Sequence, residues 1–396
     1  MSTAPNVHTR RRVARTVESL PPSGIRRFFD LVQATKGVVS LGVGEPDFAT
    51  PWIISTRGIS ALELGRTTYT SNHGLLELRL AIARHLARRY EVSYDPGSEI
   101  LVTVGVSEAL DLTCRTLLEP GDEVIIPEPC FVSYGPTVQL AHGVPVPIAT
   151  SIEQRFVPQP AQIEAAITPR TRAILLGSPG NPTGAVIPRR TLLDILEIAV
   201  AHDLVVISDE IYDRLLYDGL EHTCFAALPG ARERTVLLNG FSKAYAMTGW
   251  RVGYACAPAD ILAAMVKIHQ YSMMCASIMG QEAAIEALNR GERAVEEMVK
   301  AYDQRRRVLV EGLNQIGLEC LLPEGAFYVF PSVRSTGLDS ETFCQRLLDE
   351  EKVAVVPGNA FGACGEGHFR ATYAASIEQI REALVRIGRF VTRHRG

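Results

Sequence analysis

The stretch that decides the fold is Asn239-Gly-Phe-Ser-Lys-Ala-Tyr-Ala-Met-Thr-Gly-Trp-Arg251. It directly follows an apolar run, Thr235 to Leu238, that predicts a short buried strand. Lys243 stands a few residues after this strand, and Arg251 follows eight positions later. A primary amine can form a Schiff base with an aldehyde, and a planar guanidinium suits a phosphate. The stretch therefore predicts a site for a ligand that carries an aldehyde and a phosphate.

Composition narrows the class of protein. The chain has 396 residues, 46% of them hydrophobic and 21% charged, which is enough for two or three globular domains. A net charge of -4 gives no bulk attraction to nucleic acid or an anionic membrane, and no apolar run reaches the roughly 18 residues of a membrane span. Eight cysteines lie scattered without C-x-x-C spacing. We therefore expect a cytoplasmic protein with no metal site and no disulfide framework.

The N-terminus is basic, with Arg10, Arg11, Arg12 and Arg15, and no hydrophobic region follows it. It is not a secretory signal, and it resembles a flexible arm on a partner subunit more than an organelle transit peptide. We expect residues 1–20 to be flexible, a helix over Ile25–Val32 with Ser23 or Gly24 as its cap, and a strand over Val38–Leu41.

From about Pro51 to Leu288, short apolar runs alternate with amphipathic segments. Continuously apolar strands between helices are typical of an α/β sheet covered on both faces. The predicted strands are 100–104, 123–126, 173–176 and 204–207, and the predicted helices are 77–90, 107–118 and 188–201.

After about Arg290 the pattern changes to a second α/β unit. It begins with one long helix, 292–316, and continues with an apolar segment at 326–330, a helix near 341–349, strands 353–356 and 368–373, and a last helix from Ser376. We therefore predict a large domain over 51–290 and a small domain over 291–396, with residues 1–50 giving an arm and a strand to the small one.

Several polar residues follow predicted strands, where α/β sheets place their ligands. Gly105-Val106-Ser107 opens a helix after one strand, Gly177-Ser-Pro-Gly-Asn-Pro-Thr-Gly184 follows another, and Asp209 ends a third. Singly, each also has a plain structural interpretation. Ser107 and Asp209 suit helix caps, the proline-rich segment suits a rigid turn, and Phe131 in Pro129–Tyr134 suits the core.

The order Asn181, Asp209, Tyr212, Lys243, Arg251 resembles that of the class I/II aminotransferases, the fold-type I enzymes that use pyridoxal 5'-phosphate (PLP). The resemblance runs from about Pro22 to Val391 and implies a large domain with a mostly parallel seven-stranded sheet between helices. The segments 241–251 and 269–277 are most similar to the aspartate, aromatic and N-acetyl-diaminopimelate aminotransferase branch.

The resemblance implies a role for each matching residue. Lys243 is the Schiff-base lysine and general acid/base, Asp209 faces the pyridine nitrogen, and Tyr212 and Asn181 donate to the phenolic oxygen. Phosphate contacts come from Gly105, Val106, Ser107, Ser242 and Arg251, while Phe131 lies on the ring. Arg370 holds the substrate carboxylate with help from Asn181, and the backbone of Gly44 approaches the substrate. Tyr69 reaches the neighbouring subunit's phosphate, which implies a homodimer with shared sites.

Some positions depart from the family pattern or carry further expectations. Gly240 stands where many relatives have a hydroxyl, and Phe131 stands where Trp is common. The family pattern also implies cis peptides at Glu128–Pro129 and Asn181–Pro182.

The implied activity is transfer of an amino group from an amino acid to a 2-oxo acid, such as 2-oxoglutarate, by a ping-pong mechanism. The donor stays open, because the loop 270–277 has no Arg or Lys for a side-chain carboxylate. A PLP-dependent C–S lyase on the same fold is an alternative, since the same cofactor residues serve elimination. A PLP-sensing regulator is a weaker alternative, because the region before Val38 is too short for a winged helix and linker.

Overall fold

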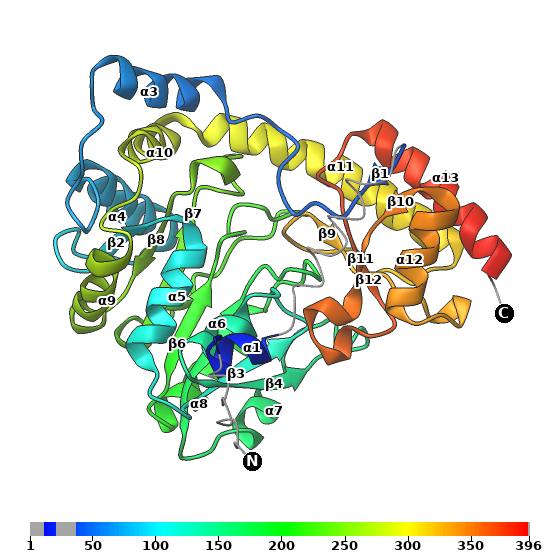
Figure 1. Ribbon diagram of the computed structural model, residues 1–396, viewed down its shortest axis with the longest axis horizontal. Coiled ribbons are helices and arrows are strands. Elements are labelled where there is room, and N and C mark those ends of the chain that lie inside the picture. The colour runs from blue at the N-terminus through cyan, green and yellow to red at the C-terminus, as the bar shows by residue number, and fades with distance from the viewer. Residues whose placement is uncertain (1–11, 21–36, 395–396) are drawn as a thin grey trace, which may run out of the picture.

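The computed structural model describes residues 12–20 and 37–394. Its centre is a seven-stranded sheet with the order β2-β8-β7-β6-β5-β3-β4 (Figure 1). Only β8, among these seven, runs antiparallel to its neighbours. The strands are β2 Ile100–Thr103, β3 Glu123–Glu128, β4 Val144–Ala149, β5 Thr171–Gly177, β6 Val205–Asp209, β7 Thr235–Gly240 and β8 Gly253–Cys256. The predicted fold class, a mostly parallel seven-stranded sheet between helices, is confirmed.

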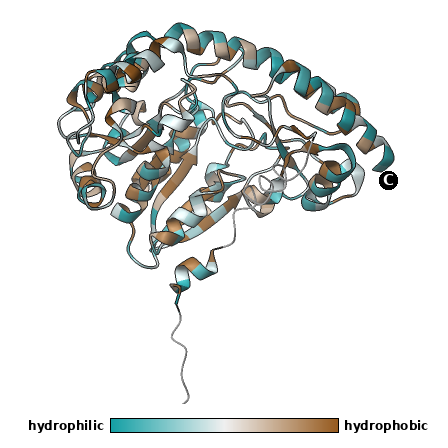
Figure 2. Ribbon diagram, turned by 45° about the horizontal axis from the view of Figure 1, so that its top comes forward, coloured by the Kyte–Doolittle hydropathy of each residue, from teal (hydrophilic) through white to brown (hydrophobic). Residues whose placement is uncertain are grey.

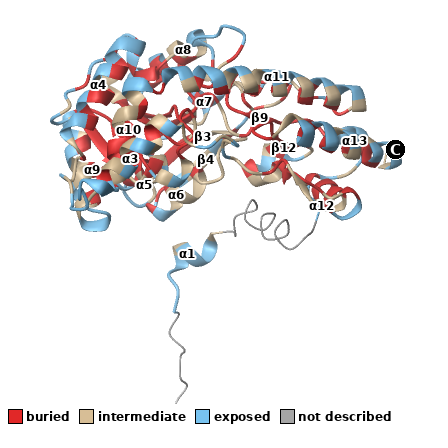
Figure 3. Ribbon diagram, turned by 90° about the horizontal axis from the view of Figure 1, so that it is seen from above, coloured by how far each residue is buried: buried red, intermediate tan, exposed pale blue. Residues whose placement is uncertain are grey.

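Helices cover both faces of this sheet because its side chains alternate between two cores. Val124 and Ile126 point into a core with α5 and α9, while Ile125 points into a core with α8. The strands are accordingly mostly hydrophobic in Figure 2 and buried in Figure 3. The helices before residue 291 are α1 Arg15–Ser19, α3 Trp52–Glu63, α4 Leu76–Tyr90, α5 Gly105–Leu117, α6 Tyr134–Leu140, α7 Pro160–Ala165, α8 Arg189–Ala201, α9 Ala259–Ser272 and α10 Ile278–Arg290.

The C-terminal part builds two small sheets. Strand β12 (Phe369–Thr372) lies between β11 (Val356–Pro357) and β9 (Tyr328–Val329), antiparallel to both. Strand β1 (Val39–Ser40) pairs in parallel with β10 (Val353–Ala354). Helix α11 (Glu292–Ile316) runs from α10 to α13 (Ile377–His394), and α12 (Ser340–Glu351) packs against α13 (Figure 1).

Short 3-10 helices complete the described chain: η1 Phe225–Ala227, η2 Arg232–Arg234, η3 Thr248–Trp250, η4 Arg334–Thr336, η5 Gly358–Phe361 and η6 Ala363–Gly365. The predicted helix over 25–32 lies outside the described residues. In the described part of the arm, Arg15–Ser19 form α1 instead of the flexible chain predicted there, and none of its residues is buried.

The predicted strand over 353–356 is two strands in different sheets, because β10 pairs with β1 and β11 pairs with β12. Both predicted cis peptides are present, and Ser178–Pro179 is a third that was not predicted.

Parallel strands bring the site residues together. Gly177 at the end of β5 pairs with Asp209 at the end of β6, and Asp209 pairs with Leu238 on β7. The segments after these strands therefore share one edge of the sheet, and β7 leads directly into Phe241–Arg251.

Candidate active site

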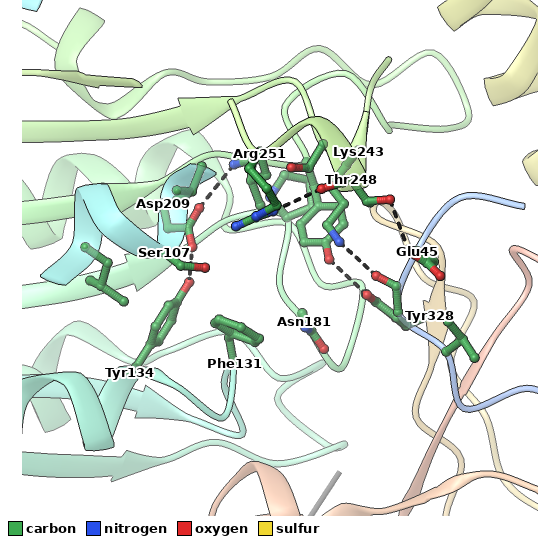
Figure 4. Close-up of a pocket in the computed structure, with 18 of the residues that line it drawn as sticks. Glu45, Ser107, Phe131, Tyr134, Asn181, Asp209, Lys243, Thr248, Arg251 and Tyr328 are labelled. Atoms are coloured by element: carbon green, nitrogen blue, oxygen red, sulfur yellow. Dashed lines mark hydrogen bonds between the residues drawn. The ribbon is translucent and has the colours of Figure 1, made fainter. Parts of the chain in front are cut away.

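A cavity of about 560 Å³ opens at this edge of the sheet (Figure 4). Residues from both parts of the chain line it: β5, β6 and β7 contribute the segments that follow them, and the C-terminal part contributes Tyr328 and Arg370. The predicted site residues that line it are Gly44, Val106, Ser107, Phe131, Asn181, Asp209, Tyr212, Ser242, Lys243, Arg251 and Arg370. Gly105 and Tyr69 do not line it.

Lys243 lies in the turn after β7 and points into the cavity (Figure 4). Its Nζ donates to the carbonyl oxygen of Gly44 at 2.8 Å. Burial and the nearby Arg370 guanidinium lower the pKa of this amine to about 8. A substantial fraction of Lys243 is therefore uncharged at mildly alkaline pH, as a nucleophile or a base needs to be.

Asp209 is 7% exposed at the end of β6 and faces the same cavity. The hydroxyl of Tyr134 donates to its Oδ2 at 2.7 Å, and the backbone N–H of Ile211 donates to Oδ1 at 3.3 Å. Burial raises the pKa of the carboxyl to about 6, and these two donors oppose that rise. At neutral pH the site therefore holds a buried negative charge that a cation in the cavity would stabilise.

Tyr134 was not among the predicted site residues. It belongs to the quoted segment Pro129–Tyr134, but its partner Asp209 lies 75 positions away, so the sequence gives no sign of the bond. Phe131, from the same segment, lines the cavity and packs edge-to-face on the Tyr134 ring with centroids 5.7 Å apart.

Arg251 lies beside the strand-to-helix turn at Gly105. Its backbone has φ +55°, and its Nη1 donates to the carbonyl oxygen of Thr248 at 3.1 Å. The guanidinium occupies the place that a side chain at Gly105 would take, and Gly105 itself has φ +72°. Gly105 thus contributes by allowing this close approach, although it does not line the cavity.

The missing hydroxyl at Gly240 has a steric explanation. A side chain there would start 2.9 Å from the Cα of Gly253 and 3.2 Å from a methyl group of Val106. The start of α5, Ser242 and Arg251 nevertheless line the same cavity, and backbone N–H groups, a hydroxyl and a guanidinium are groups that suit a phosphate.

Arg370 is 2% exposed on β12. Its Nη1 donates to Asn181 Oδ1 at 3.0 Å and its Nη2 donates to the carbonyl oxygen of Gly42 at 2.8 Å. Its Nε has no hydrogen-bond partner within residues 12–20 and 37–394. The rings of Tyr328 and Phe361 lie 4.5 and 4.9 Å from the guanidinium carbon. A buried guanidinium fixed in this way suits a carboxylate.

Tyr328 is a second residue that the sequence analysis missed. Its hydroxyl lies 2.9 Å from the hydroxyl of Tyr212, and the two rings pack edge-to-face. A side chain at Gly44 would begin 2.8 Å from the Tyr328 hydroxyl and 3.6 Å from Nη2 of Arg370. Gly44 therefore leaves the space in front of Arg370 open.

Tyr69 is 78% exposed and lies away from this cavity. Within a single chain it cannot serve the site that Lys243 occupies.

The cavity's own groups fit PLP. It offers a buried anion for a ring cation at Asp209, a cation and a helix start for a phosphate at Arg251 and Ser107, and a weakly basic amine at Lys243. No cluster of three or more His, Cys, Asp or Glu side chains suited to a metal is found in the described part of the chain. Among the helices described, none combines the length and the apolar character that crossing a membrane requires.

Comparison with known proteins agrees with this chemistry. The family described as aminotransferase class I and II matches residues 36–387. The chain is 54% identical to the putative aminotransferase YugH of Bacillus subtilis, over 95% of this chain and 97% of that protein. It is 46% identical to an aspartate aminotransferase of Pyrococcus abyssi, over 92% and 95% of the two chains. The crystal structure of an aromatic aminotransferase from Pyrococcus horikoshii superposes with a TM-score of 0.89 at 45% identity, covering 92% of this chain and 99% of that one.

Proposed function

Because the chain belongs to the class I and II aminotransferases and is a PLP-dependent aminotransferase, we propose that it passes the α-amino group of an aspartate, aromatic or related donor to a 2-oxo acid such as 2-oxoglutarate in a ping-pong cycle. One observation carries the proposal: Lys243, Asp209 and Arg370 line a single cavity. They supply an amine, a buried anion and a carboxylate-binding guanidinium to one bound amino acid. When bound, PLP supplies an electron sink for the substrate's Cα.

Lys243 is the residue that would hold the cofactor's aldehyde. With an amino acid bound, the Nζ of Lys243 would serve as the base that takes the proton from the substrate's Cα and as the acid that gives it back. A pKa of about 8 suits both directions of that transfer near neutral pH.

Asp209 would face the cofactor's ring nitrogen and keep it protonated, with Tyr134 orienting the carboxylate through its 2.7 Å hydrogen bond. Tyr212 would donate to the phenolic oxygen, and Tyr328, 2.9 Å away, fixes the position of that hydroxyl. Phe131 would lie against the ring, and Asn181 would contact both the phenolic oxygen and the substrate carboxylate.

Arg370 would bind the α-carboxylate with its fork of donors. Among the described residues that line the cavity, the cations are Lys243, Arg251 and Arg370, and each already has a role. We therefore propose that this chain's own cavity accepts aromatic or uncharged donor side chains. An acidic side chain needs a further cation, for which the arginines of the N-terminal arm are candidates.

We also propose a homodimer with shared sites. Among the residues that the structure describes, four large apolar side chains are at least two-thirds exposed: Trp52 at 74%, Leu64 at 67%, Tyr69 at 78% and Tyr271 at 88%. The segments that carry Tyr69 and Tyr271 are joined, because the Asn72 side-chain amide donates to the Met274 carbonyl oxygen at 2.8 Å. Apolar side chains that are this exposed favour burial against a second chain, where Tyr69 would reach the partner's phosphate.

We further propose the division into a large cofactor domain over 51–290 and a small domain over 291–396, with residues 1–50 contributing an arm and strand β1 to the small one. The seven-stranded sheet lies wholly within 100–256, and β1 pairs with β10. The scattered cysteines support the cytoplasm as the compartment.

A stopped-flow screen of amino acids against the purified PLP form tests the function. We expect the visible band of the bound cofactor to convert to the pyridoxamine form with at least one donor, and a 2-oxo acid to restore it. The Lys243→Ala variant should lack the pH-dependent band. Release of pyruvate and ammonia from a cysteine thioether, with no dependence on a 2-oxo acid, would instead indicate a lyase.

A further inference from the structure

A buried pair of titratable side chains lies just outside the cavity, in the first turn of α5. Glu108 and His269 approach each other with 2.7 Å between Oε1 and Nδ1, and their side chains are 8% and 0% exposed. Glu108 follows Ser107 directly, whereas His269 comes from the last turn of α9. The mechanism proposed above uses neither residue.

Glu108 fixes the turn that leads into α5. Its second carboxylate oxygen, Oε2, accepts the backbone N–H of Val104 at 2.5 Å. Val104 is the residue before the helix and makes no side-chain cap of its own. This bond satisfies the N–H of Val104, one of the donors that the start of a helix leaves without an intrahelical partner, and Val106 and Ser107, which follow shortly after, line the cavity.

The same turn is held rigidly on its other sides. The Thr103 hydroxyl donates to the carbonyl oxygen of Gly105 at 2.9 Å. A side chain at Gly253 would start 2.6 Å from the carbonyl carbon of Gly105 and from the nitrogen of Val106. The backbone of β8 is therefore in direct contact with the turn. Such contacts leave little freedom to the backbone that would receive a phosphate, which is the property a preorganised anion site needs.

The burial of the His269 ring is energetically unfavourable, and its hydrogen bond to Glu108 explains why a histidine occupies this position. Its other ring nitrogen, Nε2, is buried and has no hydrogen-bond partner in the described part of the chain. A buried polar atom without a partner is unfavourable by about 1–3 kcal/mol. An apolar residue would fill the place between α9 and α5 without that cost, so the bond from Nδ1 is the reason for a histidine here.

The pair also has an electrostatic consequence. A carboxylate in the first turn of α5 lies close to the place where a phosphate would bind, and two anions repel each other. The hydrogen bond from His269 stabilises that carboxylate in its place.

We propose that Glu108 and His269 are positioning residues for the phosphate of the cofactor, an inference that rests on the proposed function. Glu108 holds the turn from Val104 to Ser107 in the shape that receives the phosphate, and His269 holds Glu108. Neither residue touches the cofactor.

The test compares PLP with pyridoxal, which lacks the phosphate, by titrating the apoenzyme and following the visible absorbance of the bound cofactor. The readout is the ratio of the two dissociation constants. We expect wild-type enzyme to prefer PLP, and His269→Leu to reduce that preference on the order of tenfold. His269→Asn, whose amide can still donate to Oε1, should retain most of it. A merely structural defect would weaken both ligands alike and leave the ratio unchanged.

His222→Leu is the matched control. The Nε2 of His222 lies 2.6 Å from Oε2 of Glu210, and the two side chains are 3% and 2% exposed, so this variant also removes a buried histidine–carboxylate bond. It should not change the ratio. If His269→Leu fails to fold, Glu108→Ala and Glu108→Gln carry the test, because only Gln keeps an acceptor for the N–H of Val104.

An unchanged ratio in His269→Leu or, in its place, Glu108→Ala overturns the inference and leaves the proposed function standing. Wild-type enzyme that binds no PLP, or binds pyridoxal equally well, overturns both.

Discussion

Tyr134→Phe removes one hydrogen bond to Asp209 and little else. The hydroxyl donates to Oδ2 at 2.7 Å, and the ring keeps its contact with Phe131. Because this bond stabilises the charged carboxylate, its loss raises the pKa of Asp209 above its present value of about 6. The variant therefore tests whether Asp209 must be ionised for turnover.

The size of the effect follows from the geometry. A hydrogen bond to a charged group contributes about 1.5–3 kcal/mol. One pKa unit corresponds to about 1.4 kcal/mol, so we expect the pKa of Asp209 in the apoprotein to rise by roughly one to two units. Near pH 7, a large share of Asp209 would then be protonated and unable to stabilise a ring cation.

Two measurements check this. Infrared titration of the apoprotein follows the carbonyl stretch of the protonated acid, with Asp209→Asn identifying the band. In the holoenzyme, the acid limb of the pH profile of the first half-reaction should move to higher pH, and the rate should recover in alkali. A bound ring cation lowers the pKa of Asp209 in parent and variant alike, so the difference between them is the quantity to compare.

Tyr90→Phe is the matched control, because the Tyr90 hydroxyl donates to Oδ2 of Asp213 at 2.6 Å in an equally buried place outside the cavity. It should leave both titrations unchanged. If Tyr134→Phe leaves the band of Asp209 in place, or lowers its pKa, the assignment of Tyr134 is refuted.

Three further predictions concern other parts of the site. Burial raises the pKa of Asp209 from 3.8 to about 6, so its charge destabilises the apoprotein above that pH; Asp209→Asn should raise the free energy of unfolding at pH 8 by about 3 kcal/mol and leave it unchanged below about pH 4, as urea titrations will show. Arg370→Lys loses the fork of donors, and kcat/KM should fall about a hundredfold or more for every donor; an unaltered KM would contradict its role. Mixed Tyr69→Phe and Lys243→Ala chains should regain activity above that of either homodimer, because one site per heterodimer is then intact; failure to do so would argue against shared sites.

The sheet was predictable where a strand is short, apolar and covered on both faces. β4 was not predicted because it contains Pro145 and Pro147, and proline normally argues against a strand. β4 is an edge strand, paired only with β3, so it tolerates residues that cannot donate to a second neighbour. β8, Gly253–Cys256, was not predicted because its sequence Gly-Tyr-Ala-Cys has no β-branched residue and so gives a weak strand pattern.

The candidate site was predictable for a different reason. Asn181 and Lys243 each follow a strand of the same sheet and Asp209 ends one, and parallel pairing brings such positions together whatever the rest of the chain does. Tyr134 and Tyr328 were not predicted as site residues because the hydrogen-bond partner of a hydroxyl is determined by tertiary packing. Tyr328 lies 116 positions from Tyr212, inside a strand whose pattern indicates only burial.

The same distinction explains why the cofactor is easier to infer than the donor. The groups proposed to bind PLP lie at strand ends and at the start of α5, so local sequence specifies them. Around Arg370, by contrast, the chain combines β12 with Asn181 and the loop at Gly42, which are far apart in the sequence. The cations that would select an acidic donor are not among the residues that these strands position. We therefore expect donor choice to depend on parts of the enzyme that reach the cavity from outside the sheet, and variants of the arm arginines test this.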